Sequence, residues 1–418
     1  MPNYKGLFVN LISSWPPRIC GVGAFADDTA KALAVYEDDI LEIKIHPIDK
    51  DGLDYPYPVK DKHIIRQQDS ASWINAAEMI IARYRRDMEA GIKNVALLEH
   101  EYGLDGNGRD NNYNEVVRRL GKEGVPNIVV LHTVRERPDD YQIDVIRQFG
   151  ENCDRVIVLT RSSKITLRTV YGVPDEKIVH IPHGIPEFHR TMSKKDAKEK
   201  FGLADRIVIS TTGLVSENKG LEYGIRGFSK FLKGIEDHYT KRLVYLIAGQ
   251  THPDIVKKND GADPYRDELV RIAREEGLNP MIVTSTEKLT FPDSSVIFLN
   301  RHLSDNEFVD MIRASNTMLF PYTNPEQDSS GGLAYSIGLG TPAVSTKFRN
   351  AVDMFTDEHG EPDGSGVLIG FRNEEEIAEG LRKALAFENV RKMEERIRDK
   401  GGKMGMVCDW ETFDKSVT

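Results

Sequence analysis

Short apolar segments rich in valine, isoleucine and leucine recur along the chain, and each is followed by a stretch with the apolar spacing of an amphipathic helix. This alternation is typical of parallel sheets that helices cover on both faces, so we predict an α/β protein. The strands expected in the first half are 6–13, 40–48, 94–101, 127–134, 155–160 and 178–184. Those expected in the second half are 206–211, 243–250, 296–301, 318–322, 342–346 and 366–371.

A polar stretch separates the two sets of strands. Residues 185–203 contain no expected strand, and we interpret them as a linker. The same order of strands and helices on both sides predicts two doubly wound, Rossmann-like domains facing a central cleft. The expected boundaries are 1–190 for the N-terminal domain and 200–395 for the C-terminal domain.

Composition narrows the class of protein. The 418 residues, of which 39% are hydrophobic, suffice for two domains that each have a core. The formal net charge of −10 argues against nucleic acid or an anionic membrane as a general partner, because both require concentrated Lys and Arg. No apolar stretch reaches the roughly 18 residues of a membrane span, and the N-terminus is interpreted as a strand rather than an export signal. Three widely spaced cysteines, Cys20, Cys153 and Cys408, fit a reducing, cytoplasmic compartment.

Residues that follow the apolar segments are the first candidates for a site, because ligands of doubly wound sheets bind outside the carboxyl ends of the strands. Gly21 and Gly23 follow the first strand, and both a tight packing turn and a phosphate contact remain open for them. Gly213 and Lys219 occupy the equivalent turn of the second half, where the lysine is either a solvated charge or a phosphate ligand. His132 ends a strand, and a structural and a functional role are both open.

A serine- and glycine-rich turn precedes a predicted helix in the segment "NPEQDSSGGLAYSIGLGTPAVST". Ser329 and Ser330 can accept hydrogen bonds from the first N–H groups of the helix, and Gly331 and Gly332 allow close approach to the main chain. The free N–H groups and the helix dipole favour an anion there. An ordinary capped helix is the alternative.

Taken in order, these motifs resemble the retaining glycosyltransferases of glycosyltransferase family 4, which have the two-domain GT-B architecture. The likeness covers nearly the whole chain: the turn at Gly21 to Gly23, His132, the "GLVSENKG" turn, and "LFPYTNPEQDSSGGLAYSIGLGTPAVST". It also includes a final amphipathic helix around Trp410, within residues 396–418, of the kind that crosses back to the N-terminal domain. Each motif alone is weak evidence, and their common order makes the likeness specific for the architecture.

The resemblance implies transfer of a sugar from a nucleoside diphosphate sugar to an acceptor hydroxyl, with retention at the anomeric carbon and without a metal or another cofactor. A departing diphosphate needs neutralisation by N–H groups, helix termini and cations. We assign this role to the backbone of Ser330, Gly331 and Gly332, to Lys219, and to Gly23 across the cleft. The adjacent acids in "ADD", "EDD" and "PDD" point in different directions on regular elements, so no metal site is expected.

Two positions depart from the family pattern. Members of the family commonly have two glutamates seven residues apart, and here these positions fall on Gln327 and Tyr335. Gln327 can still exchange hydrogen bonds with sugar hydroxyls, and Glu326 lies beside it. Tyr335 either contacts the donor ribose or packs inside the domain. The basic residue usual after the glycine of the phosphate turn is Leu214, which leaves Lys219 as the cation.

Further polar residues at strand ends are candidates for substrate contacts. In "EHE", strand alternation places Glu99 and Glu101 on one side and His100 on the other, so the three do not form a metal site, and one acid is expected to meet the acceptor hydroxyl. Arg301 either serves a phosphate or base of the donor or forms a structural salt bridge. Loops of the first domain, such as residues 102–114, are expected to contact the acceptor.

The leading hypothesis is therefore a cytoplasmic glycosyltransferase that moves a hexose, such as mannose or glucose, to a carbohydrate or another hydroxyl acceptor. A sugar phosphorylase or epimerase of the same architecture is a second hypothesis, and a catalytically silent sugar-nucleotide-binding protein is a third. Arg83, Arg85 and Arg86 are interpreted as the solvated basic face of a helix that covers the sheet, so peripheral membrane contact is not favoured. No oligomeric state is predicted.

Overall fold

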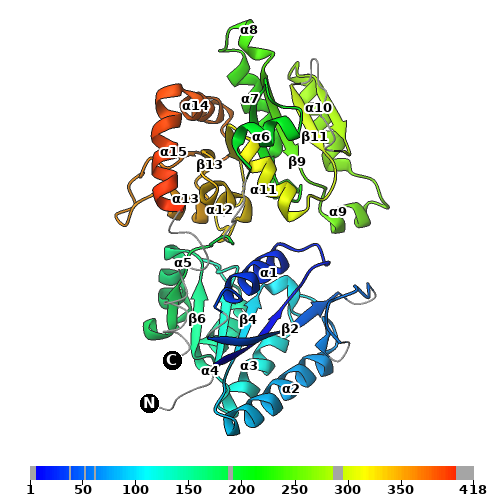
Figure 1. Cartoon of the computed structure of the whole chain (residues 1–418), viewed down its shortest axis with the longest axis vertical. Coiled ribbons are helices and arrows are strands. Elements are labelled where there is room, and N and C mark those ends of the chain that lie inside the picture. Colours follow the sequence, from blue (N-terminus) through cyan, green and yellow to red (C-terminus); the bar gives the residue numbers. More distant parts are fainter. Residues whose placement is uncertain are drawn as a thin grey trace. The chain divides into compact units, whose positions relative to one another are not determined.

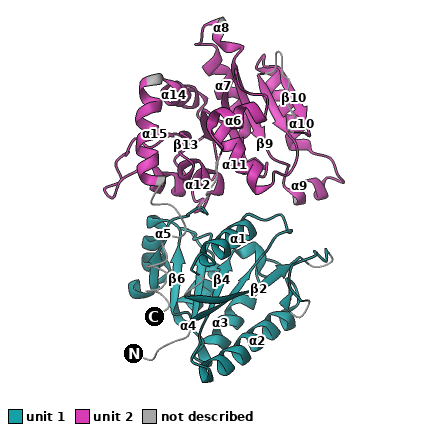
Figure 2. Cartoon of the chain, viewed as in Figure 1, with its two compact units in different colours: residues 1–187, 405–418 teal, residues 188–404 magenta. Residues whose placement is uncertain are grey.

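The computed structural model describes residues 6–36, 39–50, 53–60, 63–186, 192–285 and 295–401. The chain divides into two compact units, with the division between residues 187 and 188 (Figure 2). We call them unit 1 and unit 2 and describe each by itself. Both are built on a parallel sheet with helices on its faces (Figure 1), which confirms the predicted α/β class with two doubly wound sheets.

The sheet of unit 1 has seven strands among the described residues, in the order β3-β2-β1-β4-β5-β6-β7. They are β1 (Leu7–Ser13), β2 (Ile40–Asp49), β3 (Ile65–Arg66), β4 (Lys93–His100), β5 (Asn127–Leu131), β6 (Arg155–Val158) and β7 (Ile178–His180). Because β1 pairs with both β2 and β4, the chain reverses its winding direction at β1. In doubly wound sheets, ligands bind outside the carboxyl ends of the strands at such a reversal.

Helices cover the two faces of this sheet unequally. One face packs against α2 (Ser70–Glu89), α3 (Asn112–Lys122) and α4 (Asp140–Asn152), which share a large apolar core with the strands. The opposite face packs against α1 (Gly21–Leu33), whose Ala26 and Leu33 contact strand residues such as Leu97. The short α5 (Arg161–Thr166) follows β6. The arginines of α2 are engaged locally, since Arg83 Nε lies 2.5 Å from Asp87 Oδ2 and Arg85 forms an ion pair with Glu123.

The sheet of unit 2 also has seven strands among the described residues, in the order β10-β11-β9-β8-β12-β13-β14. They are β8 (Ile207–Thr212), β9 (Leu243–Ala248), β10 (Pro280–Val283), β11 (Val296–Leu299), β12 (Thr317–Phe320), β13 (Ala343–Thr346) and β14 (Val367–Ile369). Here the reversal lies between β8 and β12, which are paired neighbours. The carboxyl ends of these two strands are therefore the expected ligand edge.

The helices of unit 2 lie on both sides of its sheet (Figure 1). They are α6 (Lys194–Lys200), α7 (Leu221–Leu232), α8 (Asp237–Thr240), α9 (Pro253–Lys258), α10 (Pro264–Glu275), α11 (Asp305–Ala314), α12 (Gly331–Gly338), α13 (Arg349–Phe355), α14 (Glu374–Leu385) and α15 (Phe387–Gly401).

Part of the stretch interpreted as a linker is an integral helix of unit 2. Ser193 caps α6 by accepting a hydrogen bond from the N–H of Asp196 at 3.1 Å. Ala197 and Phe201 are fully buried in one core with Met311 of α11. Its many charged residues concealed this helix, because only one side of so short a helix needs to be apolar. The helix expected around Trp410 lies outside the described residues.

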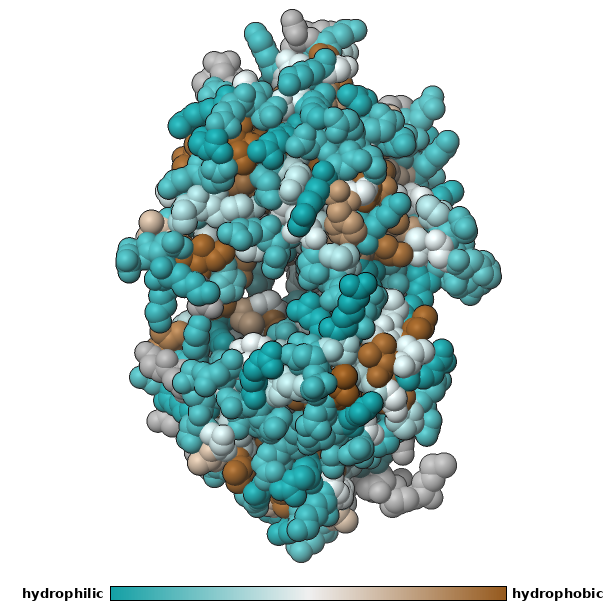
Figure 3. Space-filling model, turned by 180° about the vertical axis from the view of Figure 1, so that it is seen from behind, coloured by the Kyte–Doolittle hydropathy of each residue, from teal (hydrophilic) through white to brown (hydrophobic). Residues whose placement is uncertain are grey.

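Hydrophobic side chains are scattered over the face of the molecule that Figure 3 shows. In the view of Figure 3 hydrophilic residues dominate, and the hydrophobic ones form small, separate groups. Among the described helices, none combines the length and the apolar character needed to cross a bilayer.

Candidate functional site

In unit 2 three of the predicted donor-side residues, Gly213, Lys219 and Gly332, come together at the carboxyl ends of β8 and β12. Gly213 directly follows β8 and has a φ of +111°, a value that favours glycine. A Cβ atom on Gly332, at the start of α12, would lie 3.1 Å from the Phe320 ring of β12 and 3.6 Å from the carbonyl oxygen of Thr212. The start of α12 is therefore packed directly over the ends of both strands.

The turn that carries Lys219 is locked to the same edge. Residues Glu217–Lys219 form a short 3-10 helix, and Gly220 after it is left-handed, with a φ of +58°. A Cβ atom on Gly220 would lie 2.2 Å from the carbonyl oxygen of Pro321, just beyond β12. The N–H of Thr323 also donates to the carbonyl of Asn218 at 3.0 Å. These contacts bring Lys219 to the strand end that leads into the serine-glycine turn.

The ammonium group of Lys219 lies 3.9 Å from the centre of the Tyr322 ring. Tyr322 in turn stacks on Phe348, with ring centres 5.0 Å apart. Within the described parts of the chain, Lys219 forms no ion pair with a carboxylate. An aromatic face attracts a cation without supplying a compensating negative charge.

Ser330 caps α12, as predicted. Its Oγ accepts a hydrogen bond from the N–H of Leu333 at 3.3 Å. A Cβ atom on Gly331 would meet no atom within 4 Å, so the first residue of the helix borders open space. The helix start therefore combines a satisfied cap with an approachable backbone, which is the arrangement that an anion needs.

Residues of α13 anchor the loop that precedes α12 through an ion pair and two hydrogen bonds. Asp328 and Arg349 form a buried ion pair of 2.7 Å. The N–H groups of Arg349 and Asn350 donate to the carbonyls of Pro325 and Gln327 at 3.0 and 3.1 Å. Arg349 and its contacts were not anticipated from the sequence, and they fix the backbone that leads to Ser330.

The remaining candidates of unit 2 have more structural surroundings. The Gln327 amide Nε2 donates to the carbonyl of Ser329 at 2.9 Å, within its own loop, and Glu326 beside it is half-buried. Tyr335 is buried, with its ring 5.3 Å from that of Phe308. Arg301 donates to Glu307 Oε2 at 3.0 Å and to the carbonyl of His302 at 2.8 Å. The hydrogen bond from its guanidinium is the main reason why the pKa of Glu307 is lowered to about 2. Arg301 thus forms the structural salt bridge that was one of its two alternatives.

In unit 1 a histidine and a glutamate from neighbouring strands form a buried pair. His132 follows β5, Glu99 lies in β4, and His132 Nε2 is 2.8 Å from Glu99 Oε2. Because a carboxylate oxygen accepts hydrogen bonds, Nε2–H is the donor in this contact. The other glutamate oxygen, Oε1, is buried without a partner. As expected from strand alternation, His100 points to the other face, among the rings of Tyr102, Tyr113 and Phe149.

Two further residues adjoin this pair and were not singled out in the sequence. The Phe25 ring of α1 lies edge-on to His132 and to His183, with ring centres 4.9 Å apart in both cases. Burial lowers the pKa of His183 to about 4, so its imidazole is neutral near pH 7. The rule used for the other candidates would have marked His183, because it follows β7. It would not have marked Phe25, which lies inside α1 rather than at the end of a strand.

The other candidates of unit 1 are placed as follows. Glu101 is tied to its own strand end, because its Oε1 accepts from the N–H of Tyr102 at 2.9 Å and its Oε2 from the Thr133 hydroxyl at 2.7 Å. A Cβ atom on Gly23 would lie 3.2 Å from Ser14, which matches the packing alternative for this glycine. Gly21 begins α1 and faces open space, since a Cβ atom there would meet nothing within 4 Å.

Three loops at this edge of unit 1 are joined by two side chains. Arg18, in the loop after β1, donates to the carbonyl of Ile48 at 2.9 Å and to the Gln67 Oε1 at 2.9 Å. The Gln67 Nε2 then donates to the carbonyls of Gly103 and Gly106 at 3.1 and 2.8 Å. The loop after β4, expected to contact an acceptor, is thereby connected to the loops after β1 and β3.

We also searched the described residues for clusters of side chains that could bind a metal ion. Over the described ranges, no group of three or more His, Cys, Asp and Glu side chains is placed to hold a metal ion. The carboxyl ends of β8 and β12 in unit 2 instead present the N–H groups at the start of α12 and the ammonium group of Lys219.

Comparison with known proteins agrees with this geometry. Residues 114–187 match the family model of Glycosyltransferase Family 4. The predicted resemblance to this family is thereby confirmed, and the matched segment contains His132. No curated protein sequence is significantly similar to the chain.

Solved structures show the same fold over the whole chain. The crystal structure of Anabaena Alr3699/HepE in complex with UDP has a TM-score of 0.67 at 13% identity, and 98% of each chain is covered. A structure described as trehalose-6-phosphate from E. coli bound with UDP-2-fluoro glucose has a TM-score of 0.67 at 13% identity, covering 99% of each chain. A glycosyltransferase from Rickettsia africae has a TM-score of 0.67 at 11% identity, covering 99% of this chain and 98% of that one. The predicted GT-B fold is confirmed, and the expectation of a glycosyltransferase agrees with both comparisons.

Proposed function

We propose that the chain is a retaining glycosyltransferase that moves a hexose from a nucleoside diphosphate sugar to a hydroxyl acceptor without a metal ion. The observation that carries the proposal is the convergence of Gly213, Lys219 and the open start of α12 at the carboxyl ends of β8 and β12. A UDP-hexose is the first donor to test, because UDP or a UDP-sugar is bound in structures of the same fold.

The chemistry assigns the leaving group to unit 2. As the bond between the anomeric carbon and the diphosphate breaks, negative charge grows on the departing oxygen, and the N–H groups of Gly331 and Gly332 together with Lys219 stabilise it. For retention, the acceptor oxygen attacks the same face and passes its proton to that departing oxygen. No side-chain nucleophile is then required, which accommodates Gln327 at the position where the family commonly has a glutamate.

Unit 1 supplies groups that hold sugar hydroxyls. The hydrogen bond between His132 Nε2 and Glu99 fixes the orientation of the imidazole ring. We assign His132 a hydrogen bond to a substrate hydroxyl, and Glu99 the role of orienting it. The few cysteines support a reducing compartment for this enzyme.

The test combines binding and turnover. The full chain is first screened by thermal shift against UDP, GDP and ADP. The glucose and mannose derivatives of the nucleotide that stabilises the protein are then supplied as donors, with and without EDTA. A ligand that binds only the folded state must raise the melting temperature. Release of nucleoside diphosphate that is insensitive to EDTA is expected, with a product of unchanged anomeric configuration by NMR. If no nucleotide shifts the melting temperature and no donor is consumed, the proposal is wrong.

A silent sugar-nucleotide-binding protein is the second candidate. It is favoured by Gln327 and Tyr335, because an amide bonded to its own loop and a buried ring replace the two usual carboxylates. Tight nucleotide-sugar binding without hydrolysis or transfer across a broad acceptor panel identifies this function.

A further inference from the structure

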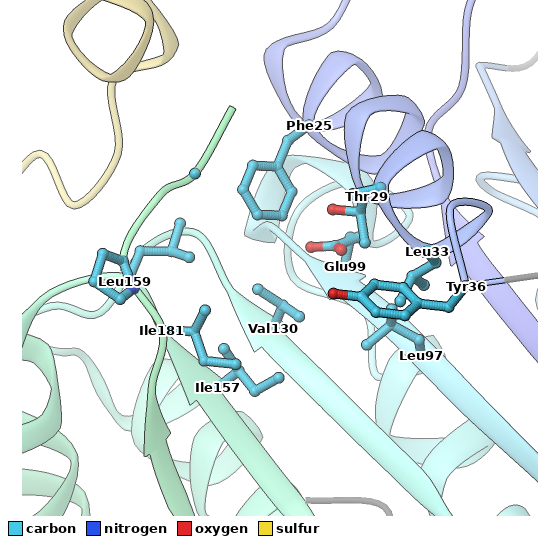
Figure 4. Close-up of a pocket in the computed structure, with 13 residues that line it drawn as sticks. Phe25, Thr29, Leu33, Tyr36, Leu97, Glu99, Val130, Ile157, Leu159 and Ile181 are labelled. Atoms are coloured by element: carbon cyan, nitrogen blue, oxygen red, sulfur yellow. The ribbon is translucent and has the colours of Figure 1, made fainter. Parts of the chain in front are cut away.

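A pocket lies inside unit 1, between α1 and the adjacent face of the sheet (Figure 4). One side of α1 lines it with Phe25, Thr29 and Leu33, which are spaced by four residues, and Tyr36 lines it from just beyond the end of the helix. Strand and loop residues opposite, such as Val130, Ile157 and Ile181, are aliphatic. No lysine or arginine is among the described residues that line the pocket, so it is unsuited to a phosphate group.

One carboxylate stands in this apolar surrounding. Glu99 lines the pocket, and its side chain is fully buried. Its Oε2 is engaged by His132, whereas its Oε1 is buried without a hydrogen-bond partner. A buried acceptor without a donor is costly, and a hydroxyl placed against it removes that cost. Figure 4 shows the oxygens of Glu99 and of Thr29 and Tyr36 directed toward the space that the aliphatic side chains border.

We propose that this pocket is the acceptor subsite, and that it holds an acceptor whose apolar aglycone contacts the aliphatic wall while one of its hydroxyls donates to Glu99 Oε1. The inference rests on the proposed glycosyl transfer and specifies its acceptor as an alkyl or aryl alcohol or glycoside. A free sugar would leave most of the aliphatic lining without an apolar partner. A sugar phosphate would place its charge where no lysine or arginine of the described lining can meet it.

The experiment measures binding of 4-nitrophenyl β-D-glucopyranoside to the full chain by calorimetry, beside glucose and glucose 6-phosphate. We expect the aryl glucoside to bind at least tenfold more tightly than either, because only it buries an apolar group. Thr29→Phe fills the pocket from a half-buried position on α1 and should abolish this preference. Ala24→Phe, at an exposed position of the same helix, is the matched control and should keep it.

A second variant tests the polar contact. Glu99→Gln keeps the size of the side chain and removes the charge, so aryl glucoside affinity should fall about tenfold or more. Unchanged melting temperature and UDP affinity would show that the fold and unit 2 are intact in each variant.

The outcomes separate the two proposals. If the chain binds and turns over UDP-glucose but binds the aryl glucoside no better than glucose, or if Thr29→Phe retains the preference, the pocket inference is wrong and the proposed function stands. If neither UDP nor UDP-glucose binds, the proposed function is wrong, and an aryl-binding pocket would then have no acceptor role.

Discussion

Asp328 and Arg349 form an ion pair of 2.7 Å with side chains only 1% and 5% exposed, directly below the turn that leads into α12. Buried charges are tolerated when each is paired, and removing one partner leaves the other uncompensated. The pair therefore couples the folding stability of unit 2 to the position of the backbone at Ser330.

We predict that Arg349→Met lowers the free energy of unfolding by about 3–5 kcal/mol, because Asp328 would lose its buried ion pair with Arg349. Urea denaturation at pH 7 measures the effect. The matched control is Arg271→Met on α10, whose pair with Glu268 is 54% and 46% exposed. That exposed pair should contribute at most about 1 kcal/mol, so equal losses in both variants would contradict the structural role of Arg349.

Lys219→Ala should weaken nucleoside diphosphate binding by about tenfold to a hundredfold, because a charge-assisted contact to phosphate is lost. The melting temperature without nucleotide should change little, since Lys219 forms no ion pair in the described part of the chain. Calorimetric titration with UDP tests this. Lys195→Ala, at a side chain that is 83% exposed, serves as the control. If the Lys219→Ala variant bound UDP as tightly as the wild type, Lys219 would not be part of the nucleotide-binding site.

Glycines of the same edge should respond in opposite ways to valine. Gly331→Val enters open space and should cost less than about 1 kcal/mol of stability while abolishing UDP binding, because it covers the N–H groups. Gly220→Val requires a left-handed valine, and its Cβ would lie 2.2 Å from the carbonyl of Pro321. We expect it to cost more than about 2 kcal/mol. Thermal denaturation and UDP titration of both variants test this prediction. A stable Gly331→Val variant that still binds UDP would refute the proposed phosphate site at the start of α12.

His100 should make the stability of the protein depend on pH. Burial lowers its pKa from 6.5 to about 3, so the folded protein keeps it neutral while the unfolded chain takes up a proton below pH 6.5. Its contribution to stability is thus present above pH 6.5 and is lost as the pH falls toward 3. In His100→Phe the slope of unfolding free energy against pH, between roughly pH 4 and 6, should decrease by about 1.4 kcal/mol per pH unit.

The control for this titration is His359→Phe, because the His359 side chain is 77% exposed. Its slope should equal that of the wild type. A slope in His100→Phe that also equals the wild type would mean that His100 is not buried in its neutral form.

Sequence patterns predicted twelve of the fourteen described strands, because a buried parallel strand needs a continuous apolar run that few other elements show. The two edge strands β3 and β10 were missed, because β3 has only two residues and β10 is only partly buried. Gly213, Lys219 and Ser330 were chosen as candidates from the predicted strands. The rule that ligands of doubly wound sheets bind outside the carboxyl ends of the strands can be applied to the sequence alone. The opposite directions of Glu99 and His100 likewise follow from the two-residue repeat of a strand.

Other features depend on contacts between segments that are distant in the chain. The pairing of Glu99 with His132 requires β4 and β5 to be neighbours, and the anchoring of Asp328 requires the position of α13. The open side of α1 was also hidden, because Phe25, Thr29 and Leu33 have the spacing of a helix that simply covers a sheet. Helix α6 was missed because its charged residues resemble a linker.

Arg18 and Gln67 carry a practical consequence for engineering. The loop after β4 is not an independent module, because its Gly103 and Gly106 carbonyls are tethered through Gln67 and Arg18 to segments more than thirty positions away in the chain. Transplanting that loop alone from a homologue would sever the tether, whereas a graft that brings the Arg18 and Gln67 segments along would carry its own support.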